Sequence, residues 1–210
     1  MIKLSLKELD EALSNPVAYR AKITRRQSGL EYFPPSYFLQ LRNAIFNFHQ
    51  EENDPIMGEI YLNEKLSDPK FKKESKKDET RQQYVWYVKE FSSRGVWHSN
   101  IKYNISIKPT EYAFIDLNLT GEVARLDLNP IVGYSAWIFR SNNPNNWVGE
   151  IRMPLIQDEL SKILNVPLNE ISMGIYSFKE KYVEEHCFSP KDVQASKLKL
   201  ATLVQNQGYI

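Results

Sequence analysis

Gly121-Glu122-Val123-Ala124-Arg125-Leu126-Asp127 and the later stretch Ala136-Trp137-Ile138-Phe139-Arg140 decide how this chain folds. The first alternates apolar Val123, Ala124 and Leu126 with charged residues, the second is apolar and aromatic, and Asn129-Pro130 between them is typical of a turn. A similar run precedes them, so the sequence predicts an antiparallel meander of three strands. The expected strands cover Ile101–Lys108, Tyr112–Asp127 and Gly133–Arg140.

Helical patterns lie on both sides of the predicted meander, where apolar residues recur at spacings of three and four. A short apolar run near the end of the chain predicts one more strand, which is buried. We therefore expect a mixed α/β (α+β) fold with a central mixed sheet flanked by helices. The other expected elements are helices over residues 6–14, 37–51, 84–91, 154–164 and 190–204, and a strand over residues 171–178.

Length and composition indicate one globular domain over residues 1–210, because 42% hydrophobic residues suffice for a core. The 27 Lys and Arg residues nearly balance 26 Asp and Glu residues, so the whole chain attracts nucleic acid or membranes only weakly. Any basic surface must be local. The lysine-rich stretch over residues 63–80 has few apolar residues and is predicted to be a mobile loop or the frayed start of a helix.

Cys187 is the only cysteine, which excludes an internal disulfide, a multi-cysteine zinc site and a cysteine-ligated iron–sulfur cluster. We expect no cofactor and a reducing, cytoplasmic location. The N-terminus lacks the apolar stretch of a secretory signal, and no run approaches the ~20 apolar residues of a membrane span. A soluble protein without a membrane partner is therefore expected.

The order of helix, helix, three strands, helix, strand and helix resembles the RecB-type branch of the PD-(D/E)XK nuclease superfamily. Residues 121–127 are similar to the family's Gly-x-x-Asp-Arg-x-Asp strand, with Ala124 at the position of the first catalytic aspartate. Residues 136–140 are similar to the apolar strand that ends in Asp-x-Lys, with Ile138 and Arg140 in place of Asp and Lys. The resemblance therefore implies a degenerate member of this superfamily.

The family's chemistry depends on two carboxylates that hold Mg²⁺ and on a lysine that stabilises the reacting phosphate. The side chains of Ala124 and Ile138 offer no oxygen to a metal. Arg140 can bind a phosphate with two hydrogen bonds, but its guanidinium cannot give up a proton. The resemblance thus implies that no catalytic residue set is intact, although Gln157 matches the glutamine that opens the family's next helix.

These substitutions favour a catalytically silent nuclease-fold module that binds nucleic acid, either DNA or RNA, or a protein partner in DNA processing or defence. Cations near the expected site supply the phosphate contacts of this hypothesis. A simpler interpretation makes the lysine run a solvated loop and places Arg125 and Arg140 in ion pairs with Glu122 or Asp127. The candidate nucleic-acid contacts are Arg125, Arg140, Lys72, Lys73, Lys76 and Lys77.

Two alternatives stay open. The first is an active Mg²⁺- or Mn²⁺-dependent nuclease with migrated acids, because Glu122 shares a strand face with Ala124 at about 7 Å. Its metal ligands would be His49, on the predicted second helix where the family often carries a metal-binding histidine, Glu122 and Glu150. A packed or surface histidine is the plainer interpretation of His49. The second alternative is a purely structural protein-interaction domain with no affinity for nucleic acid.

Overall fold

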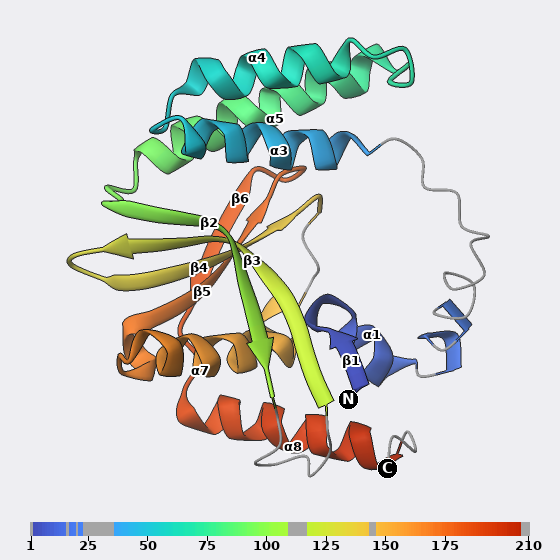
Figure 1. Cartoon of the computed structure of the whole chain (residues 1–210), viewed down its shortest axis with the longest axis vertical. Helices are drawn as coiled ribbons and strands as arrows, with labels where there is room; N and C mark the ends of the chain where they lie inside the picture. The colour runs from blue at the N-terminus through green and yellow to red at the C-terminus, as the bar shows by residue number, and fades with distance from the viewer. Residues whose placement is uncertain are drawn as a thin grey trace.

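The computed structural model describes residues 2–15, 17–19, 21–22, 36–108, 117–142 and 146–206. Within these residues, six strands form one mixed sheet between two layers of helices (Figure 1). The strands are β1 (Ile2–Ser5), β2 (His98–Ile107), β3 (Leu117–Asn129), β4 (Gly133–Arg140), β5 (Ile171–Ser177) and β6 (Tyr182–His186). The α-helices are α1 (Leu9–Ser14), α3 (Tyr37–Gln50), α4 (Pro55–Leu66), α5 (Glu74–Ser92), α7 (Arg152–Leu164) and α8 (Pro190–Asn206).

β3 is the central strand, and both of its edges are used. β2 runs antiparallel along one edge. On the other edge, β1 pairs in parallel with Leu117–Thr120, and β4 pairs antiparallel with Arg125–Asn129. β5 then lies parallel to β4, and β6 closes the sheet antiparallel to β5. Among the described strands, the residues of β3 between these two pairings have a partner only in β2, so the sheet splits there.

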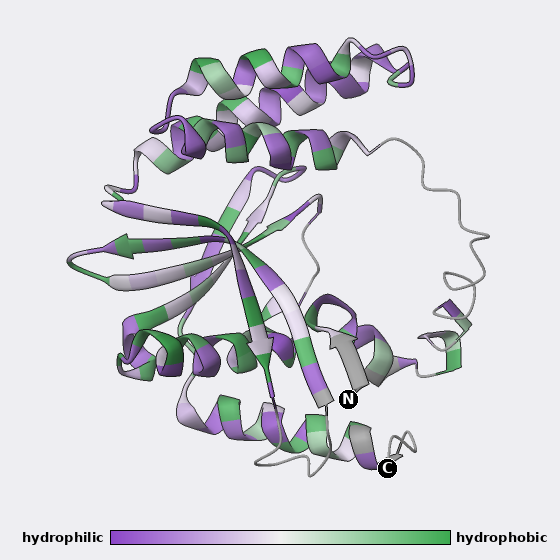
Figure 2. Ribbon diagram, viewed as in Figure 1, coloured by the Kyte–Doolittle hydropathy of each residue, from purple (hydrophilic) through white to green (hydrophobic). Residues whose placement is uncertain are grey.

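Each face of the sheet is covered by its own hydrophobic cluster. α3, α4 and α5 cover one face together with Trp137, Phe139 and Tyr176, whereas α7 and α8 cover the other together with Leu119 and Met173. Hydrophobic and hydrophilic residues alternate along α3 and α7 in Figure 2, as expected of helices with one buried face. The side chain of Ser36 caps the start of α3 by accepting a hydrogen bond from the backbone N–H of Leu39 (3.1 Å).

A buried ion pair lies in the centre of the sheet. Arg125 is fully buried, and its Nε and Nη2 donate to the two carboxylate oxygens of Asp127 at 2.7 and 2.6 Å. The guanidinium also donates to the hydroxyls of Tyr87 on α5 and Tyr176 on β5. Each charge is therefore paired and hydrogen-bonded, which is the condition for burying an ion pair without a large penalty.

The carboxylate of Asp127 extends this network to two more strands. It accepts hydrogen bonds from the indole Nε1 of Trp137 on β4 and from the hydroxyl of Ser99 on β2, both at 2.7 Å. The indole needs space over β5, because a Cβ at Gly174 would lie 2.4 Å from the Trp137 ring. The network thus joins β2, β3, β4, β5 and α5.

The mixed sheet flanked by helices and the antiparallel meander of β2, β3 and β4 are confirmed. β4 has the predicted bounds, whereas residues 112–116 of the second expected strand lie outside the described residues. The sequence did not predict β1, β6 or α4. No helix in the described part of the chain is both long and apolar enough to span a membrane.

The mobile loop predicted over residues 63–80 is wrong, whereas the alternative, the start of a helix, agrees with residues 74–80. This segment contains the end of α4, a turn and the start of α5. Phe71 anchors the turn, since its side chain is buried and contacts the ring of Tyr37 edge-on at 5.0 Å. The lysines alternate with acids at helical spacing, as in the pairs Lys76–Glu79 and Lys77–Glu74, so a composition that is typical of a loop forms an exposed helix face.

Replacing Asp127 with Asn tests the buried ion pair, because it leaves the Arg125 guanidinium without a counter-charge. Removing one partner of a buried pair is strongly destabilising, so we expect Asp127→Asn to lower the free energy of unfolding by about 3–5 kcal/mol. Urea unfolding measures the loss. Glu64→Gln, which removes an exposed ion pair with Lys65, is the control and should leave the unfolding midpoint unchanged. Equal midpoints for the two variants would contradict this role of Asp127.

Candidate functional site

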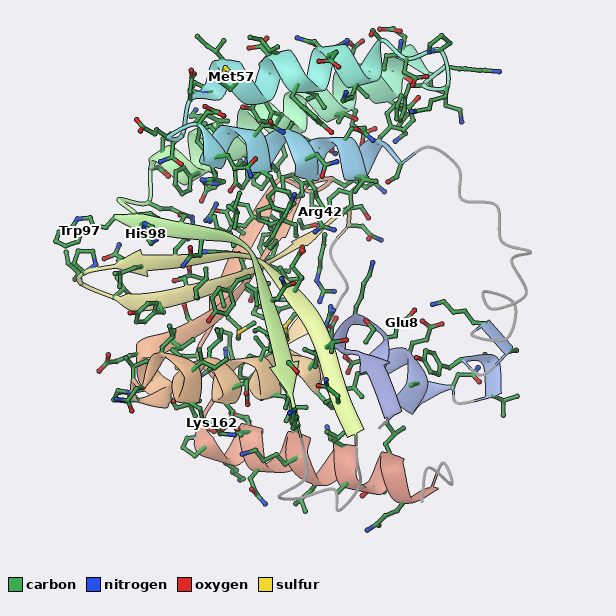
Figure 3. All side chains as sticks on the ribbon, in the orientation of Figure 1. Glu8, Arg42, Met57, Trp97, His98 and Lys162 are labelled. Atoms are coloured by element: carbon green, nitrogen blue, oxygen red, sulfur yellow. The ribbon has the colours of Figure 1, made fainter. Side chains whose placement is uncertain are left out.

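A cavity of about 470 Å³ opens where the sheet splits. Its walls come from the turn after β1, the stretch of β3 that is paired only with β2, the end of β4, and the helices α3 and α7. A close approach makes this arrangement possible, because Leu6 packs directly over Gly121, where a Cβ would lie 2.9 Å from the Cβ of Leu6. Figure 3 labels Arg42 on α3 and Glu8 on the turn after β1, which mark two of these elements.

The structure brings together the positions that the sequence singled out on two different strands. Ala124 and Glu122 of β3 and Ile138 and Arg140 of β4 all line this cavity. Glu122 and Ala124 share one side of β3, as predicted, whereas Asp127 belongs to the buried ion pair. Neither Ala124 nor Ile138 presents an oxygen or nitrogen atom to the cavity.

Cations dominate the charged part of the cavity wall. Lys7, Arg42, Arg140 and Arg152 line it, together with the single carboxylate of Glu122. The Nη2 of Arg42 donates to the Oε1 of Glu122 at 2.6 Å. Among the described lining residues, cations therefore outnumber acids, and the wall favours an anionic ligand.

Glu150 holds the second half of this cationic wall. Its Oε2 accepts hydrogen bonds from the Nη2 of Arg140 at 2.6 Å and from the Nε of Arg152 at 2.8 Å. Asp10 lies close to this group and accepts a hydrogen bond from the backbone N–H of Ile151 (2.9 Å). Burial raises the pKa of Asp10, opposed by that hydrogen bond and reinforced by the negative charge of Glu150.

Two donors in the wall are buried and unused. The Nε atoms of Arg42 and Arg140 have no hydrogen-bond partner among the residues that the structure describes. A buried donor without an acceptor is costly, so such atoms are uncommon in native proteins. Both arginines therefore retain one donor that their carboxylate partners, Glu122 and Glu150, leave unsatisfied.

No family model and no curated protein matches this sequence. The chemistry of the cavity must therefore be inferred from its own side chains. A concave site of this volume, with apolar walls and a few converging polar groups, is typical of ligand-binding pockets.

Two sequence-predicted residues have structural roles. Arg125, predicted to contact nucleic acid, is fully buried in its pair with Asp127, so it cannot reach a ligand and that prediction is corrected. Gln157 is also buried outside the cavity. Its Nε2 donates to the carbonyls of Leu168 and Phe188 at 3.0 and 3.1 Å, and its Oε1 accepts from the Phe188 N–H at 2.9 Å. Gln157 thereby fixes the segments that flank β5 and β6.

The four predicted lysine contacts lie in the α4–α5 turn and the start of α5, outside the cavity wall. Lys72, Lys73 and Lys76 are exposed, and Lys77 is half-buried. The turn contacts α3 next to the cavity, because the backbone N–H of Lys73 donates to the Tyr37 hydroxyl at 3.1 Å.

His49 lies in the α3–α5 layer and does not line the cavity. Burial, followed by the charge of Arg125, lowers its pKa from 6.5 to about 3, so the imidazole is neutral. A neutral ring fits its contacts: Nδ1 donates to the Oδ1 of Asn53 (2.8 Å), and Nε2 accepts from the hydroxyl of Tyr87 (2.7 Å). Both ring nitrogens are thereby used.

The metal set expected for an active nuclease is not brought together. His49 does not line the cavity wall that holds Glu122, and the carboxylates of Glu122 and Glu150 are each bound by arginine. Within the described ranges, no three His, Cys, Asp or Glu side chains form a group that could hold a metal ion.

The sequence did not single out Lys7, Arg42 or Arg152 as binding residues. Arg42 lies four positions after Phe38 on α3, and both line the cavity. That spacing places two side chains on one helix face, a signal that helical periodicity alone contains. Lys7 and Arg152 depend on the contact between the turn after β1 and α7, which no local pattern reveals.

The low pKa of His49 gives a pH dependence with a definite sign. Between pH 6.5 and about 3 the unfolded chain binds a proton at His49 and the folded chain does not, so stability falls as pH falls. The contribution is up to about 1.4 kcal/mol per pH unit. From pH 7.5 to 5, wild type should lose about 2 kcal/mol more unfolding free energy than His49→Gln.

Urea unfolding at the two pH values measures this difference. His98→Gln replaces an exposed histidine at the start of β2 and serves as the control, with the acid dependence of wild type. If His49→Gln also keeps the full acid dependence, the neutral, buried state of His49 is refuted.

Proposed function

We propose that this chain is a catalytically silent nuclease-fold module that binds nucleic acid through the cavity at the split in the sheet. The observation that carries the proposal is the cavity wall. Lys7, Arg42, Arg140 and Arg152 line the place where the resemblance to PD-(D/E)XK nucleases puts the catalytic groups. Phosphate contacts by lysine and arginine supply most of the affinity of non-specific nucleic-acid binding. The resemblance suggests a role in DNA processing or defence.

The absence of cutting follows from side-chain chemistry. Mg²⁺ requires oxygen ligands, and Ala124 and Ile138 provide none at the two positions that the family uses. Arg140 in place of lysine keeps a positive charge that can bind a phosphate with two hydrogen bonds. The side chains of this wall are therefore suited to holding a phosphate group.

The lysine-rich turn extends the basic surface beyond the cavity. Lys73 bonds to Tyr37, and the next residue of α3, Phe38, forms part of the cavity wall. Exposed Lys72 and Lys76 lie on the same turn and the following helix. A strand bound in the cavity could continue along these cations, an arrangement typical of single-strand binding.

One observation favours an active metal-dependent nuclease as the second candidate. The carboxylate of Glu122 lines the cavity, and Glu150 contacts the cations of its wall. Both carboxylates are engaged by arginine, so a metal would have to displace guanidinium groups before it could bind. This cost makes the second candidate weaker than the first.

A purely structural protein-interaction domain is the third candidate. Ile56, Met57 and Ile60 on α4 expose large parts of their apolar side chains, and Figure 3 labels Met57 on the outer side of that helix. Such side chains suit a protein contact. They are separate from the cavity, so the two surfaces can be tested independently.

Binding to a fluorescent single-stranded DNA tests the proposal. We expect salt-dependent binding that Arg140→Ala weakens at least about tenfold, because a charge-assisted, partly buried contact is lost. Arg81→Ala removes an arginine of α5 outside the cavity wall and is the control. The same protein with Mg²⁺ or Mn²⁺ should leave DNA and RNA intact.

Three results separate the candidates. Divalent-dependent cleavage that disappears in Glu122→Ala would establish the metal-dependent nuclease. A complete lack of DNA and RNA binding at low salt would favour the protein-interaction domain. Binding that Arg140→Ala and Arg81→Ala weaken equally would place the nucleic acid outside the cavity.

A further inference from the structure

We infer that Arg42 and Arg140 bind a terminal phosphate group, the phosphomonoester at the end of a nucleic acid strand, and that Glu122 and Glu150 occupy their guanidinium groups in the free protein. This inference rests on the proposed function. It adds the chemical class of the group that is bound and names the residues that compete for the site.

The reasoning begins with how arginine binds an oxyanion. Nε–H and one Nη–H lie side by side on one edge of the guanidinium, at a spacing that matches two oxygens of one anion. Arg125 uses this edge fully, since its Nε and Nη2 bind the two oxygens of Asp127 at 2.7 and 2.6 Å. Arg125 is therefore an example, within this chain, of a guanidinium edge whose two donors are both hydrogen-bonded.

In Arg42 and Arg140, only one of the two donors on this edge of the guanidinium is hydrogen-bonded. The Nη2 of Arg42 binds Glu122, and the Nη2 of Arg140 binds Glu150, each at 2.6 Å. In both arginines the neighbouring Nε is buried and has no partner in the described part of the chain. A group that offers two suitably spaced oxygens to each edge would satisfy both donors, which the carboxylates do not.

The number of oxygens favours a monoester. An internal phosphodiester has two non-bridging oxygens and one charge, which suffices for one guanidinium edge. A terminal phosphate has three strong acceptor oxygens and a charge near −2 at neutral pH, which suits two edges. Arg42 and Arg140 line one cavity of about 470 Å³, which is within the usual range for small-ligand sites.

The carboxylates of Glu122 and Glu150 can separate from Arg42 and Arg140 and still be stabilised by other hydrogen bonds. Glu150 keeps the hydrogen bond from the Nε of Arg152 (2.8 Å) when Arg140 turns to a phosphate. The side chain of Glu122 is 34% exposed, so water can solvate it when Arg42 is withdrawn. The two acids therefore act as weak internal competitors for the phosphate.

Three single-stranded oligonucleotides of one sequence test the inference: one with a 5′-phosphate, one with a 3′-phosphate and one with neither. We expect one phosphorylated form to bind wild type at least about tenfold more tightly than the unphosphorylated form. Arg140→Lys and Arg42→Lys keep the charge and lose the paired donors, so each should abolish most of this preference. Arg81→Lys, outside the cavity wall, should retain it.

Variants of the two carboxylates test whether the acids compete with the phosphate, because removing a competitor strengthens binding whereas removing a supporting group weakens it. Glu150→Gln removes a competitor and should strengthen binding of the phosphorylated oligonucleotide, as should Glu122→Gln. Weaker binding in both variants would mean that the acids position Arg42 and Arg140 for binding instead of competing with the phosphate, and would overturn the inference. Circular dichroism and thermal melting confirm that each variant is folded before its affinity is compared.

The outcomes distinguish this inference from the function on which it rests. Equal affinity for all three oligonucleotides overturns the terminal-phosphate site and leaves nucleic-acid binding intact. If inorganic phosphate binds wild type but no oligonucleotide is preferred, the site binds a small free phosphate. This result also overturns the inference of a site for the end of a strand. If none of the oligonucleotides binds, the proposed function fails as well.

Discussion

The buried ion pair of Arg125 and Asp127 is the constraint on which the rest of this structure depends. Two charges at the centre of a sheet are tolerable only when every donor and acceptor is satisfied. Tyr87, Tyr176 and Trp137 provide those contacts from one helix and two further strands. The requirement therefore fixes α5 and four strands relative to one another. It also fixes where β4 joins β3, and hence where the sheet splits and the cavity opens.

Arginine has two different roles in this chain, and the hydrogen bonds of each guanidinium distinguish them. Arg125 is complete, because its paired donors bind both oxygens of one carboxylate and aromatic rings surround its charge. Arg42 and Arg140 are incomplete, because each binds a single oxygen and leaves Nε unsatisfied. A guanidinium whose paired donors are both hydrogen-bonded suits a structural residue, whereas an unsatisfied donor in a cavity wall suits a binding residue.

Local periodicity predicted the elements that bury one regular face. β4 and α3 are examples, since Trp137 and Phe139 recur two positions apart on the strand, and Leu41 and Ile45 recur four positions apart on the helix. β1 and β6 escaped prediction because they have only 4 and 5 residues, and β6 is mostly polar. α4 exposes apolar residues such as Ile60, so it lacks the contrast that reveals an amphipathic helix.

The candidate site was only partly predictable for a related reason. Ala124, Ile138 and Arg140 were proposed from the resemblance to the nuclease motifs, and the structure places all three in the cavity wall. Arg125 had two expected roles, a nucleic-acid contact and an ion pair with Glu122 or Asp127, because a strand pattern does not say whether a charge finds a buried partner; the structure shows the pair with Asp127. Arg42 was missed, since its place in the cavity depends on how α3 packs over a distant strand.

The arginine Nε–H groups allow the most direct test of the account. Nitrogen-15 NMR can follow the Nε–H signals of Arg42, Arg140 and Arg125, assigned through Arg→Lys variants, while single-stranded DNA is added. The account predicts that the signals of Arg42 and Arg140 shift as DNA binds, whereas the signal of Arg125 stays in place. DNA binding that leaves the signals of Arg42 and Arg140 unchanged would contradict the account, because the nucleic acid would then bind elsewhere on the protein.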